Sequence, residues 1–574
     1  MKTNRVIKIF LASSEELEAD RYRFGNLIRK LDNIYEKRGI RIELFEWEDY
    51  DAAYNGMRKQ DEYNERVRAS DMFLALFHKK AGKFTIEEFN IARKAFDEQA
   101  SPKIYTYIKD LEAGESESRE LAEFKRLMLE ELGHYWCRYS NFDTMQLHFV
   151  LQLQMVEATT PIKVEVKESQ VKIGDSTIAD LNNVPFTSEN ATHRELQSRK
   201  EQLDREIGNA ESGGRRGFFG QRSRMTDEAL ANLREERESV TEQIERQEKA
   251  LVDTAMSIAR MQGGECSPRM RTAAELFEKG EIDKAEAVLK EDDMEADATN
   301  AKLKFDTAAQ PTAELTRNIE RCAGEYMLKA RIVVSGIADE SRYRQAVKLM
   351  STAIDLVSGR LPEETLAEYL FDYAVLLTDT GQQTKALETW ERLSGIYERL
   401  YRKAPQKYAY GYAGVLNNMA VLYSDKGDFD HCLSKYLKAI DIYDWLDREE
   451  PGIYDDDIAR LKNNLGTLYS DRDEYNKALS EFNEAARIRF ELLAKDNDPD
   501  SRSALADIYC NMATALQFSD HPQEALRYIA QAHAILDELD KEFPRIYEYK
   551  LYSILNREGS IYTRLDQLDK AEES

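Results

Sequence analysis

Side chains that can do chemistry gather in the loops after three strand-like segments near the start of the chain. Ser13 and Ser14 follow the first segment, Trp47 and Asp49 follow the second, and Glu88 lies just beyond the third. Because the carboxyl ends of parallel strands meet at one edge of a sheet, we expect these residues around one crevice. Serine hydroxyls and loop amides suit phosphate or ribose hydroxyls, and an indole ring can stack on a base. A carboxylate can attack an electrophilic carbon or stabilise a developing cation.

The stretch around Glu88 resembles the catalytic region of Toll/interleukin-1 receptor (TIR) domains. It reads Glu88-Phe89-Asn90-Ile91-Ala92, which matches that family's glutamate, hydrophobic residue, two variable residues and alanine. Residues 70–92 are also similar to nucleoside deoxyribosyltransferases, which share a flavodoxin-like fold and cleave an N-glycosidic bond. The resemblance covers about residues 1–158. It implies that Glu88 is catalytic and that NAD+ is a substrate, with no separate cofactor and no metal.

The chemistry implied by this resemblance needs few protein groups. An N-glycosidic bond breaks through an oxocarbenium-like transition state, which one carboxylate can stabilise or capture. Adjacent residues of a helix point in different directions, so only one of two neighbouring glutamates can face the crevice. We predict that this residue is Glu88 and not Glu87.

Structural roles are the alternatives for the same residues. A helix over 85–98 with Thr85 as its N-cap would place Glu88 in the first turn, where a carboxylate complements the helix dipole. Ser13 and Ser14 could cap the first helix, and Trp47 could be a packing residue. His78 has no cysteine or acidic partner at a metal-binding spacing, and we expect it to be structural.

The first 158 residues alternate between strand and helix patterns. An apolar run such as residues 72–77 is typical of a strand that is buried on both faces of a parallel sheet. Alternation of this kind predicts a doubly wound, flavodoxin-like α/β domain over 1–158. The remaining segments of this domain are strands over 6–11, 41–45, 104–108 and 134–139 and helices over 15–38, 116–132 and 143–156.

Residues 159–262 have a different composition. Residues 159–190 form a linker that could contain a small hairpin. Residues 191–262 hold two long, highly charged stretches that predict an antiparallel helical hairpin. The glycine- and arginine-rich loop 211–226 between them is most simply disordered, or it could dock an acidic partner or another copy. An irregular segment is expected over 290–311.

The last 170 residues contain near-copies of one helical segment, such as 416–423 and 462–469. Each copy is followed by a turn and a small residue on a second helix. This pattern predicts helix-turn-helix repeats that bury their apolar faces by stacking. It resembles the tetratricopeptide repeat in its long-helix form. We expect a solenoid over 268–574 whose last repeat is incomplete in this sequence. The small residues, spaced by 46, 46, 47 and 46 positions, are Ala386, Cys432, Ala478, Ala525 and Ala571.

Asn418, Asn464 and Asn511 occupy equivalent positions on successive inner helices. The tetratricopeptide resemblance implies that they hydrogen-bond a protein or peptide ligand on the concave face. The alternative is a ladder of contacts between neighbouring helices.

Composition excludes several classes of function. The net charge of −26 argues against general binding to nucleic acid or to anionic membranes. No apolar run approaches the eighteen residues of a membrane helix. Five scattered cysteines without metal-ligand spacing indicate free thiols in a reducing cytoplasm.

Three functions fit these features. The first is a TIR-like NAD+ glycohydrolase effector that is controlled by a repeat sensor and self-associates through its first domain, as in bacterial antiphage or stress defence. The second is a non-catalytic TIR-type signalling scaffold. The third is base removal from nucleosides or nucleotides by the same glutamate.

Overall fold

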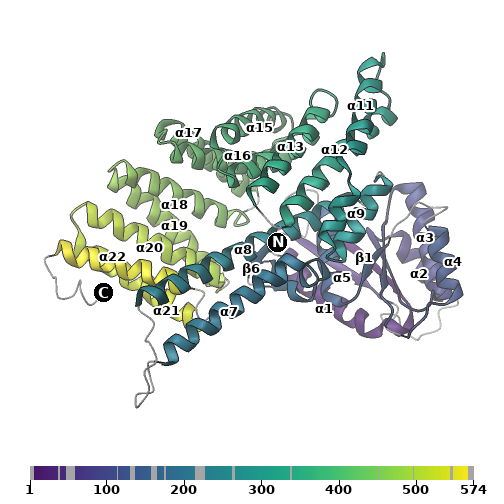
Figure 1. The fold of residues 1–574 in the computed structure, drawn as a ribbon, viewed down its shortest axis with the longest axis horizontal. Coiled ribbons are helices and arrows are strands. Elements are labelled where there is room, and N and C mark those ends of the chain that lie inside the picture. Colours follow the sequence, from purple (N-terminus) through teal and green to yellow (C-terminus); the bar gives the residue numbers. More distant parts are fainter. Residues whose placement is uncertain are drawn as a thin grey trace. The chain divides into compact units, whose positions relative to one another are not determined.

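The structure is a computed structural model of the chain. It describes residues 5–36, 39–46, 59–112, 114–128, 136–156, 164–167, 169–173, 176–213, 227–261, 266–336, 339–449, 451–495, 497–542 and 547–565. The chain divides into two compact units, residues 1–362 and residues 363–574. A parallel sheet begins the first unit and helices make up the second (Figure 1). The predicted fold class is therefore confirmed.

A five-stranded parallel sheet with the order β2-β1-β3-β4-β5 forms the core of the first unit. All six residues of the central strand β3 are buried, as its apolar sequence predicts. The strands are β1 (Arg5–Ser13), β2 (Ile40–Phe45), β3 (Met72–Phe77), β4 (Lys103–Lys109) and β5 (Cys137–Tyr139). The five predicted strands are thus present, with ends that differ by a few residues.

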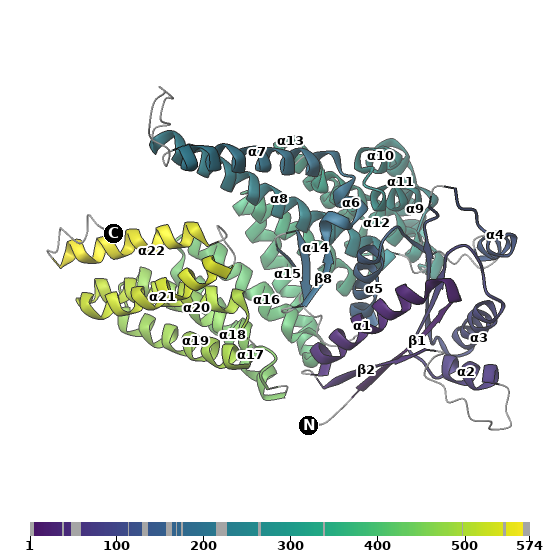
Figure 2. The same ribbon diagram turned by 90° about the horizontal axis from the view of Figure 1, so that it is seen from below.

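Helices cover both faces of this sheet (Figure 2). On one face α1 (Glu18–Glu36) and α5 (Phe142–Val156) pack against Ile7, Ile9 and Leu11 of β1. The other face contacts the remaining three helices through side chains such as Phe10 and Phe73. Because side chains alternate along a strand, β1 supplies apolar residues to both layers. Those three helices are α2 (Lys59–Arg68), α3 (Lys83–Gln99) and α4 (Arg119–Arg126).

A three-stranded antiparallel sheet follows, where the sequence indicated only a two-stranded hairpin. Its extra strand pairs with β7, and Ile173 and Ile178 pack against the first core. The third strand was missed because only two of its five residues are buried, which leaves a weak alternation. The elements are β6 (Glu165–Lys167), β7 (Gln170–Ile173), β8 (Ser176–Asp180) and the short helix α6 (Pro185–Ser188).

The predicted helical hairpin consists of α7 (Ala191–Gly213) and α8 (Asp227–Met261), which run side by side (Figure 1). A small apolar seam of Leu203, Val240 and Ile244 holds the two helices together. The Arg199–Glu236 ion pair adds a contact across the seam. Residues 214–226, which include most of the basic loop, lie outside the described residues.

Five further helices complete the first unit. Residues 291–307 form a helix, so the prediction of an irregular segment over 290–311 was wrong there. Its first turn carries Glu291, Asp292 and Asp293, and three carboxylates at a helix N-terminus favour the helical state through the dipole. The five are α9 (Pro268–Glu278), α10 (Ile282–Val288), α11 (Glu291–Thr307), α12 (Ala313–Ser335) and α13 (Glu340–Val357).

A close contact with the backbone of α6 explains why a glycine stands at position 280. Gly280 has a φ of +76°, and a Cβ atom there would lie 2.5 Å from the carbonyl oxygen of Pro185 in α6. Phe186 also stacks on Phe277 of α9, with ring centroids 5.5 Å apart. The helices after residue 268 are therefore packed onto the preceding segment within the first unit. A solenoid domain over 268–574 stays a prediction, since the division of the chain falls at residues 362 and 363.

The second unit is an array of helices joined by short turns, as the helix-turn-helix repeat pattern predicts. Equivalent turns carry a left-handed residue at Gly381, Gly427, Asp473 and Asp520. The small residues Ala386, Cys432, Ala478 and Ala525 are fully buried. The helices are α14 (Glu363–Asp379), α15 (Gln383–Lys403), α16 (Pro405–Asp425), α17 (Phe429–Glu449), α18 (Asp455–Asp471), α19 (Tyr475–Lys495), α20 (Pro499–Phe518), α21 (Pro522–Glu542) and α22 (Glu548–Arg564). Among the described residues, no helix is both long and apolar enough to span a membrane.

Candidate functional site

The topology of the parallel sheet creates a crevice between β1 and β3. The chain leaves β1 through α1 on one face and leaves β3 through α3 on the opposite face. In open sheets with this strand order, the carboxyl ends of these two strands form the usual ligand crevice. We call the loops that follow β1 and β3, with the last residues of β4 and β5, the switch-point edge.

Glu16 links the two loops of this edge. Its Oε1 atom accepts hydrogen bonds from the backbone N–H groups of Lys79 (2.9 Å) and Lys80 (3.1 Å). The Ser14 hydroxyl lies 3.4 Å from the same oxygen. Glu16 belongs to a single 3-10 turn between β1 and α1, and its side chain is exposed. One carboxylate oxygen thus satisfies two consecutive amides of the loop after β3.

Arg21 organises the serine loop from the other side. Its Nη1 atom donates to the Ser13 hydroxyl (2.8 Å) and to the Ser14 carbonyl oxygen (3.0 Å). Arg21 is only 2% exposed, and Ser13 lies in register with the β1 residues that face α1. The two predicted ligand-binding serines are therefore close together at the crevice, and both contact a buried cation.

A second buried group, Asp20, connects the far strands to α1. Its Oδ2 atom accepts from Lys109 Nζ and from the Tyr139 hydroxyl, each at 2.9 Å. Asp20 is 4% exposed. Burial raises the pKa of Tyr139, and the negative charge of Asp20 raises it further, so the phenol stays a donor. This contact holds the ends of β4 and β5 against α1.

His78 and Lys79 surround a carboxylate in the loop after β4. Lys79 Nζ lies 2.5 Å from Glu115 Oε1, and His78 Nε2 lies 3.3 Å from Glu115 Oε2. The hydrogen bond from Lys79 lowers the pKa of Glu115, and the same contact raises the pKa of Lys79. Within the described part of the chain, no group of three or more histidine, cysteine or acidic side chains is arranged to hold a metal ion.

Glu88 and Glu87 point in different directions from α3. The helix begins at Lys83 with Gly82 as its N-cap, so the prediction of Thr85 as the cap was wrong and Glu88 lies in the second turn. Gly82 has an extended backbone that lets the helix start earlier. Glu88 is 7% exposed and belongs to the buried stripe with Phe89 and Ala92. Glu87 is half-buried and accepts a 3.2 Å hydrogen bond from Asn64 of α2.

The grouping of all five predicted site residues around one crevice stays a prediction. Trp47 and Asp49 lie outside the described residues. Ser13 faces the α1 layer, whereas Glu88 comes from the helix that covers the opposite layer. The structure thus places Ser13 and Ser14 at the end of β1 and Glu88 on the helix that covers the opposite face of the sheet.

Sequence reasoning missed the residues that shape this edge. Glu16, Asp20 and Arg21 lie where the first helix begins. Charged residues are common at the start of a surface helix, so the sequence does not distinguish these three from solvent-exposed charges. Their partners are up to 119 residues away along the chain. The only local signal is that polar residues directly follow or precede buried strands.

The second unit offers a groove between the inner helices α20 and α22. It has a volume of about 510 Å³ and is lined by residues that include Thr514, Phe518, Tyr552 and Arg557. Phe518 and Tyr552 are 53% and 48% exposed, which is high for aromatic side chains. Arg557 donates to the Thr514 hydroxyl at 2.6 Å across the groove.

The asparagine series lies on the inner helices α16, α18 and α20, and its members are half-buried. Asn511 Nδ2 donates to Asn463 Oδ1 of the preceding inner helix (3.1 Å). Asn464 hydrogen-bonds Tyr436, whose pKa is raised by burial and lowered in part by this bond. Both contacts join neighbouring helices, and the first of them uses Asn463 and not the series member Asn464. The ladder alternative stays a prediction. Ligand binding by Asn418, Asn464 and Asn511 stays a prediction.

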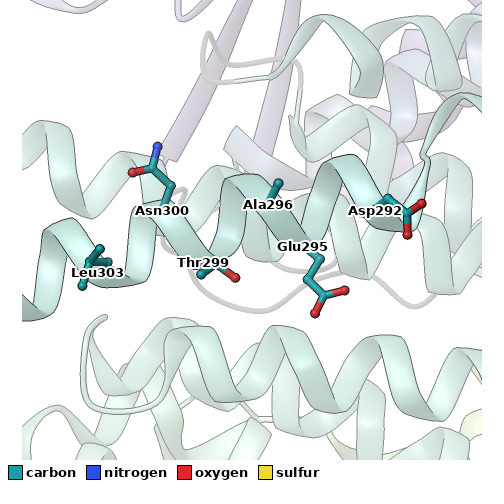
Figure 3. A pocket seen from close by; sticks show the side chains of 6 residues that line it. All are labelled: Asp292, Glu295, Ala296, Thr299, Asn300 and Leu303. Carbon is teal, nitrogen blue, oxygen red and sulfur yellow. The ribbon is translucent and has the colours of Figure 1, made fainter.

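Another hollow, of about 550 Å³, lies along α11 in the first unit (Figure 3). Six side chains of this one helix line it, among them Asp292, Glu295 and Leu303. It is wide open and carries two carboxylates with a 61% exposed leucine. It shares no lining residue with the switch-point edge.

No protein-family model and no curated protein matches the sequence. Among solved structures the chain is similar to BtubC (BKLC) from P. vanneervenii, with 19% identity, 43% of this chain and 92% of that chain covered, and a TM-score of 0.33. It is similar to the quorum sensor NprR from B. thuringiensis, with 11% identity, 66% and 96% covered, and a TM-score of 0.29.

A third similar structure is the STAND protein PH0952 from Pyrococcus horikoshii, which has a tetratricopeptide repeat sensor. Its identity is 12%, with 100% of this chain and 87% of that chain covered and a TM-score of 0.34. These TM-scores are too low to carry an argument about function.

Proposed function

We propose that residues 1–158 are a nucleotide-cleaving effector domain in which Glu88 promotes hydrolysis of NAD+. The proposal also holds that the helical repeats bind a protein or peptide that controls this activity. The observation that supports it is the burial of Glu88 on the helix that follows β3. The sheet has the strand order β2-β1-β3-β4-β5, and ligands of such sheets usually bind beside the carboxyl ends of β1 and β3.

The proposed reaction needs few protein groups. The bond between the ribose C1′ atom and the nicotinamide nitrogen breaks, and its electron pair leaves with neutral nicotinamide. A carboxylate beside C1′ stabilises the oxocarbenium-like transition state. Water then adds to C1′ and releases a proton, so that the products are nicotinamide and ADP-ribose. A largely desolvated carboxylate is more effective in this role than an exposed one, because solvent screens it less.

The other groups of the edge suit the rest of the substrate. Ser13 and Ser14 present hydroxyls at the end of β1, and Arg21 holds their loop. Trp47 and Asp49 remain proposed substrate-binding residues, with the Trp47 indole stacking on the base. Self-association through this domain remains part of the proposal.

The repeat unit supplies the proposed control. A polar stripe of half-buried asparagines and a groove with exposed aromatic side chains fit a peptide, whose backbone needs hydrogen bonds and whose side chains need apolar contact. The partner-binding residues are proposed to be Asn418, Asn464 and Asn511.

The test is release of nicotinamide from NAD+ by the full chain at high protein concentration. We expect Glu88→Gln to reduce release by about 100-fold or more, since it keeps the shape and removes the charge. Glu87→Gln is the matched control, because it removes an adjacent carboxylate that contacts Asn64 instead, and we expect it to change the rate by less than about threefold.

Other outcomes identify the alternatives. Equal loss in both variants would assign the effect to the stability of α3. Release of bases from nucleosides without release of nicotinamide would favour the nucleoside N-glycosidase. No release from any of these substrates, with the chain clustered by a chemically induced dimeriser, would favour the non-catalytic scaffold.

A further inference from the structure

The contact between Glu16 and the loop after β3 has the geometry of an occupied anion site. Two consecutive backbone N–H groups, of Lys79 and Lys80, converge on one oxygen atom at 2.9 and 3.1 Å. The Ser14 hydroxyl provides a third donor at 3.4 Å. Successive amides that point into one concavity bind anionic oxygens, and phosphate is a common ligand of such nests. Here the anionic oxygen comes from the protein itself.

The position of this nest matches a place where ligands are expected. Lys79 and Lys80 lie two and three residues after the end of β3, and Ser14 directly follows β1. These are the two strands whose carboxyl ends border the switch-point crevice. The three donors therefore lie on both walls of one crevice and not on a random surface turn.

The carboxylate that fills the nest is easy to displace. Glu16 is exposed and sits on a single 3-10 turn, so moving its side chain into water uncovers little apolar surface. Its bonds are charge-assisted but solvent-exposed, which makes each of them weak. A ligand that carries more negative charge can compete for the same donors.

The charges around the nest are mixed. Lys80 is exposed and adds a positive charge at the rim. The ammonium of Lys79 pairs with Glu115 and also lies close enough to Glu16 to act on it electrostatically. Glu112 also lies close enough to Lys79 to act on it electrostatically. The selectivity of the nest must therefore come chiefly from its directed amides.

We propose that the amides of Lys79 and Lys80, with the Ser14 hydroxyl, form a binding site for a phosphate group of a dinucleotide, and that Glu16 is an internal competitor which occupies this site until the ligand displaces it. The choice of a dinucleotide rests on the proposed function, whereas the phosphate site itself does not. The Glu16 carboxylate thereby lowers the resting affinity of the crevice for its ligand.

The test is calorimetric titration of the full-length protein with inorganic pyrophosphate. We expect the wild type to bind weakly and Glu16→Ala to bind about tenfold more tightly, since the donors lose their competitor and a like charge. Glu16→Gln keeps an oxygen acceptor without the charge and should lie between the two. Added salt should weaken binding in every variant.

A matched control separates competition from net charge. Glu18→Ala removes an exposed carboxylate two positions away from Glu16. It removes one negative charge, as Glu16→Ala does, but leaves the Glu16 carboxylate bound in the nest. We expect its pyrophosphate affinity to stay within about twofold of the wild type. Adding Ser14→Ala to Glu16→Ala should remove part of the gain, because one donor is lost.

Several results would overturn the proposal. Equal affinity of Glu16→Ala and Glu18→Ala would reduce the effect to general electrostatics. Absence of pyrophosphate binding in a Glu16→Ala protein with unchanged circular dichroism and thermal unfolding would show that Glu16 is only a tie between loops. If Glu16→Ala does not fold, the Glu16→Gln variant decides by the same comparison.

The outcome is independent of catalysis. Tight pyrophosphate binding without nicotinamide release would support the phosphate site and refute the proposed function. The opposite result is release of nicotinamide that depends on Glu88, is unaffected by Glu16→Ala and occurs without pyrophosphate binding. It would support the proposed function and refute the phosphate site.

Discussion

The repeat unit and the switch-point edge build their polar contacts in opposite ways. In the repeats one contact recurs: residues 382, 428, 474 and 521 each donate a backbone bond of 2.9 Å to the carbonyl five positions earlier. This bond closes the helix end in a Schellman-type cap. At the edge no contact recurs. Glu16 and Asp20 each bind partners between 63 and 119 residues away.

The difference shows how each region responds to change. A repeat array is stabilised by interfaces between nearest neighbours. A destabilising substitution is therefore expected to lower stability most in its own repeat and less in each repeat further away. The edge is held by single long-range contacts that join separate strands, so one lost side chain frees several segments at once. Hydrogen exchange measured peptide by peptide on the full chain distinguishes these two patterns.

The largest effect is expected from Asp20→Ala. It leaves the Lys109 ammonium and the Tyr139 hydroxyl without their shared acceptor in a largely buried place. We expect the opening free energy of peptides from α1, β4 and β5 to fall by about 2–4 kcal/mol. Peptides from 416–423 should exchange as in the wild type. Glu18→Ala is the exposed control and should change neither region, so a similar effect of Glu18→Ala would contradict the comparison.

An intermediate effect is expected from Ala478→Leu in α19. Ala478 is fully buried at the close crossing of two helices, and a larger side chain would overpack that crossing. We expect protection to fall by about 1–3 kcal/mol in α18 and α19 and by less in α20 and α21. Ser480→Leu adds similar bulk at an exposed position of the same helix and should have little effect. Uniform loss across all repeats would break the nearest-neighbour picture.

The smallest effect concerns the turns between paired helices. Gly427 and Asp473 occupy equivalent turns with φ values of +70° and +58°. Gly427→Ala should cost about 1 kcal/mol, because a Cβ atom is strained in this conformation. Asp473→Gly relieves the same strain and should not lower stability by more than about 0.5 kcal/mol. Urea denaturation measures the free energy of unfolding of the two variants. Equal losses in both would show that equivalent turns of the repeats do not respond to these substitutions in the same way.

Much of the fold could be predicted because its signals are local. The apolar run 72–77 coincides with β3, and the small residues at the helix crossings are all buried where the structure describes them. The elements that were missed or misjudged lack a strong local signal. β8 has few buried residues, and α11 has a low amphipathic contrast. α3 begins at Lys83 after the N-cap Gly82, which has no capping side chain to mark the start of the helix.

The candidate site was predictable only in outline. The rule that ligands bind at the carboxyl ends of parallel strands pointed to Ser13, Ser14 and Glu88. Ser13 ends β1, Ser14 follows it, and Glu88 lies in the second turn of α3, the helix after β3. It could not identify Glu16, because an exposed glutamate after a serine loop looks like any solvated charge. Nor could it show that Arg21 holds both serines.

The sequence by itself determined the periodic parts of this protein: the alternation of strands and helices before residue 158 and the 46-residue repeat after residue 380. Helix and strand periods and small residues at helix crossings act between near neighbours, so the pattern can be read along the chain. Only the tertiary structure decided which polar groups meet. The partners of Glu16 and Asp20 are brought together by the order of strands in the sheet, and that order is set by packing between segments far apart in sequence.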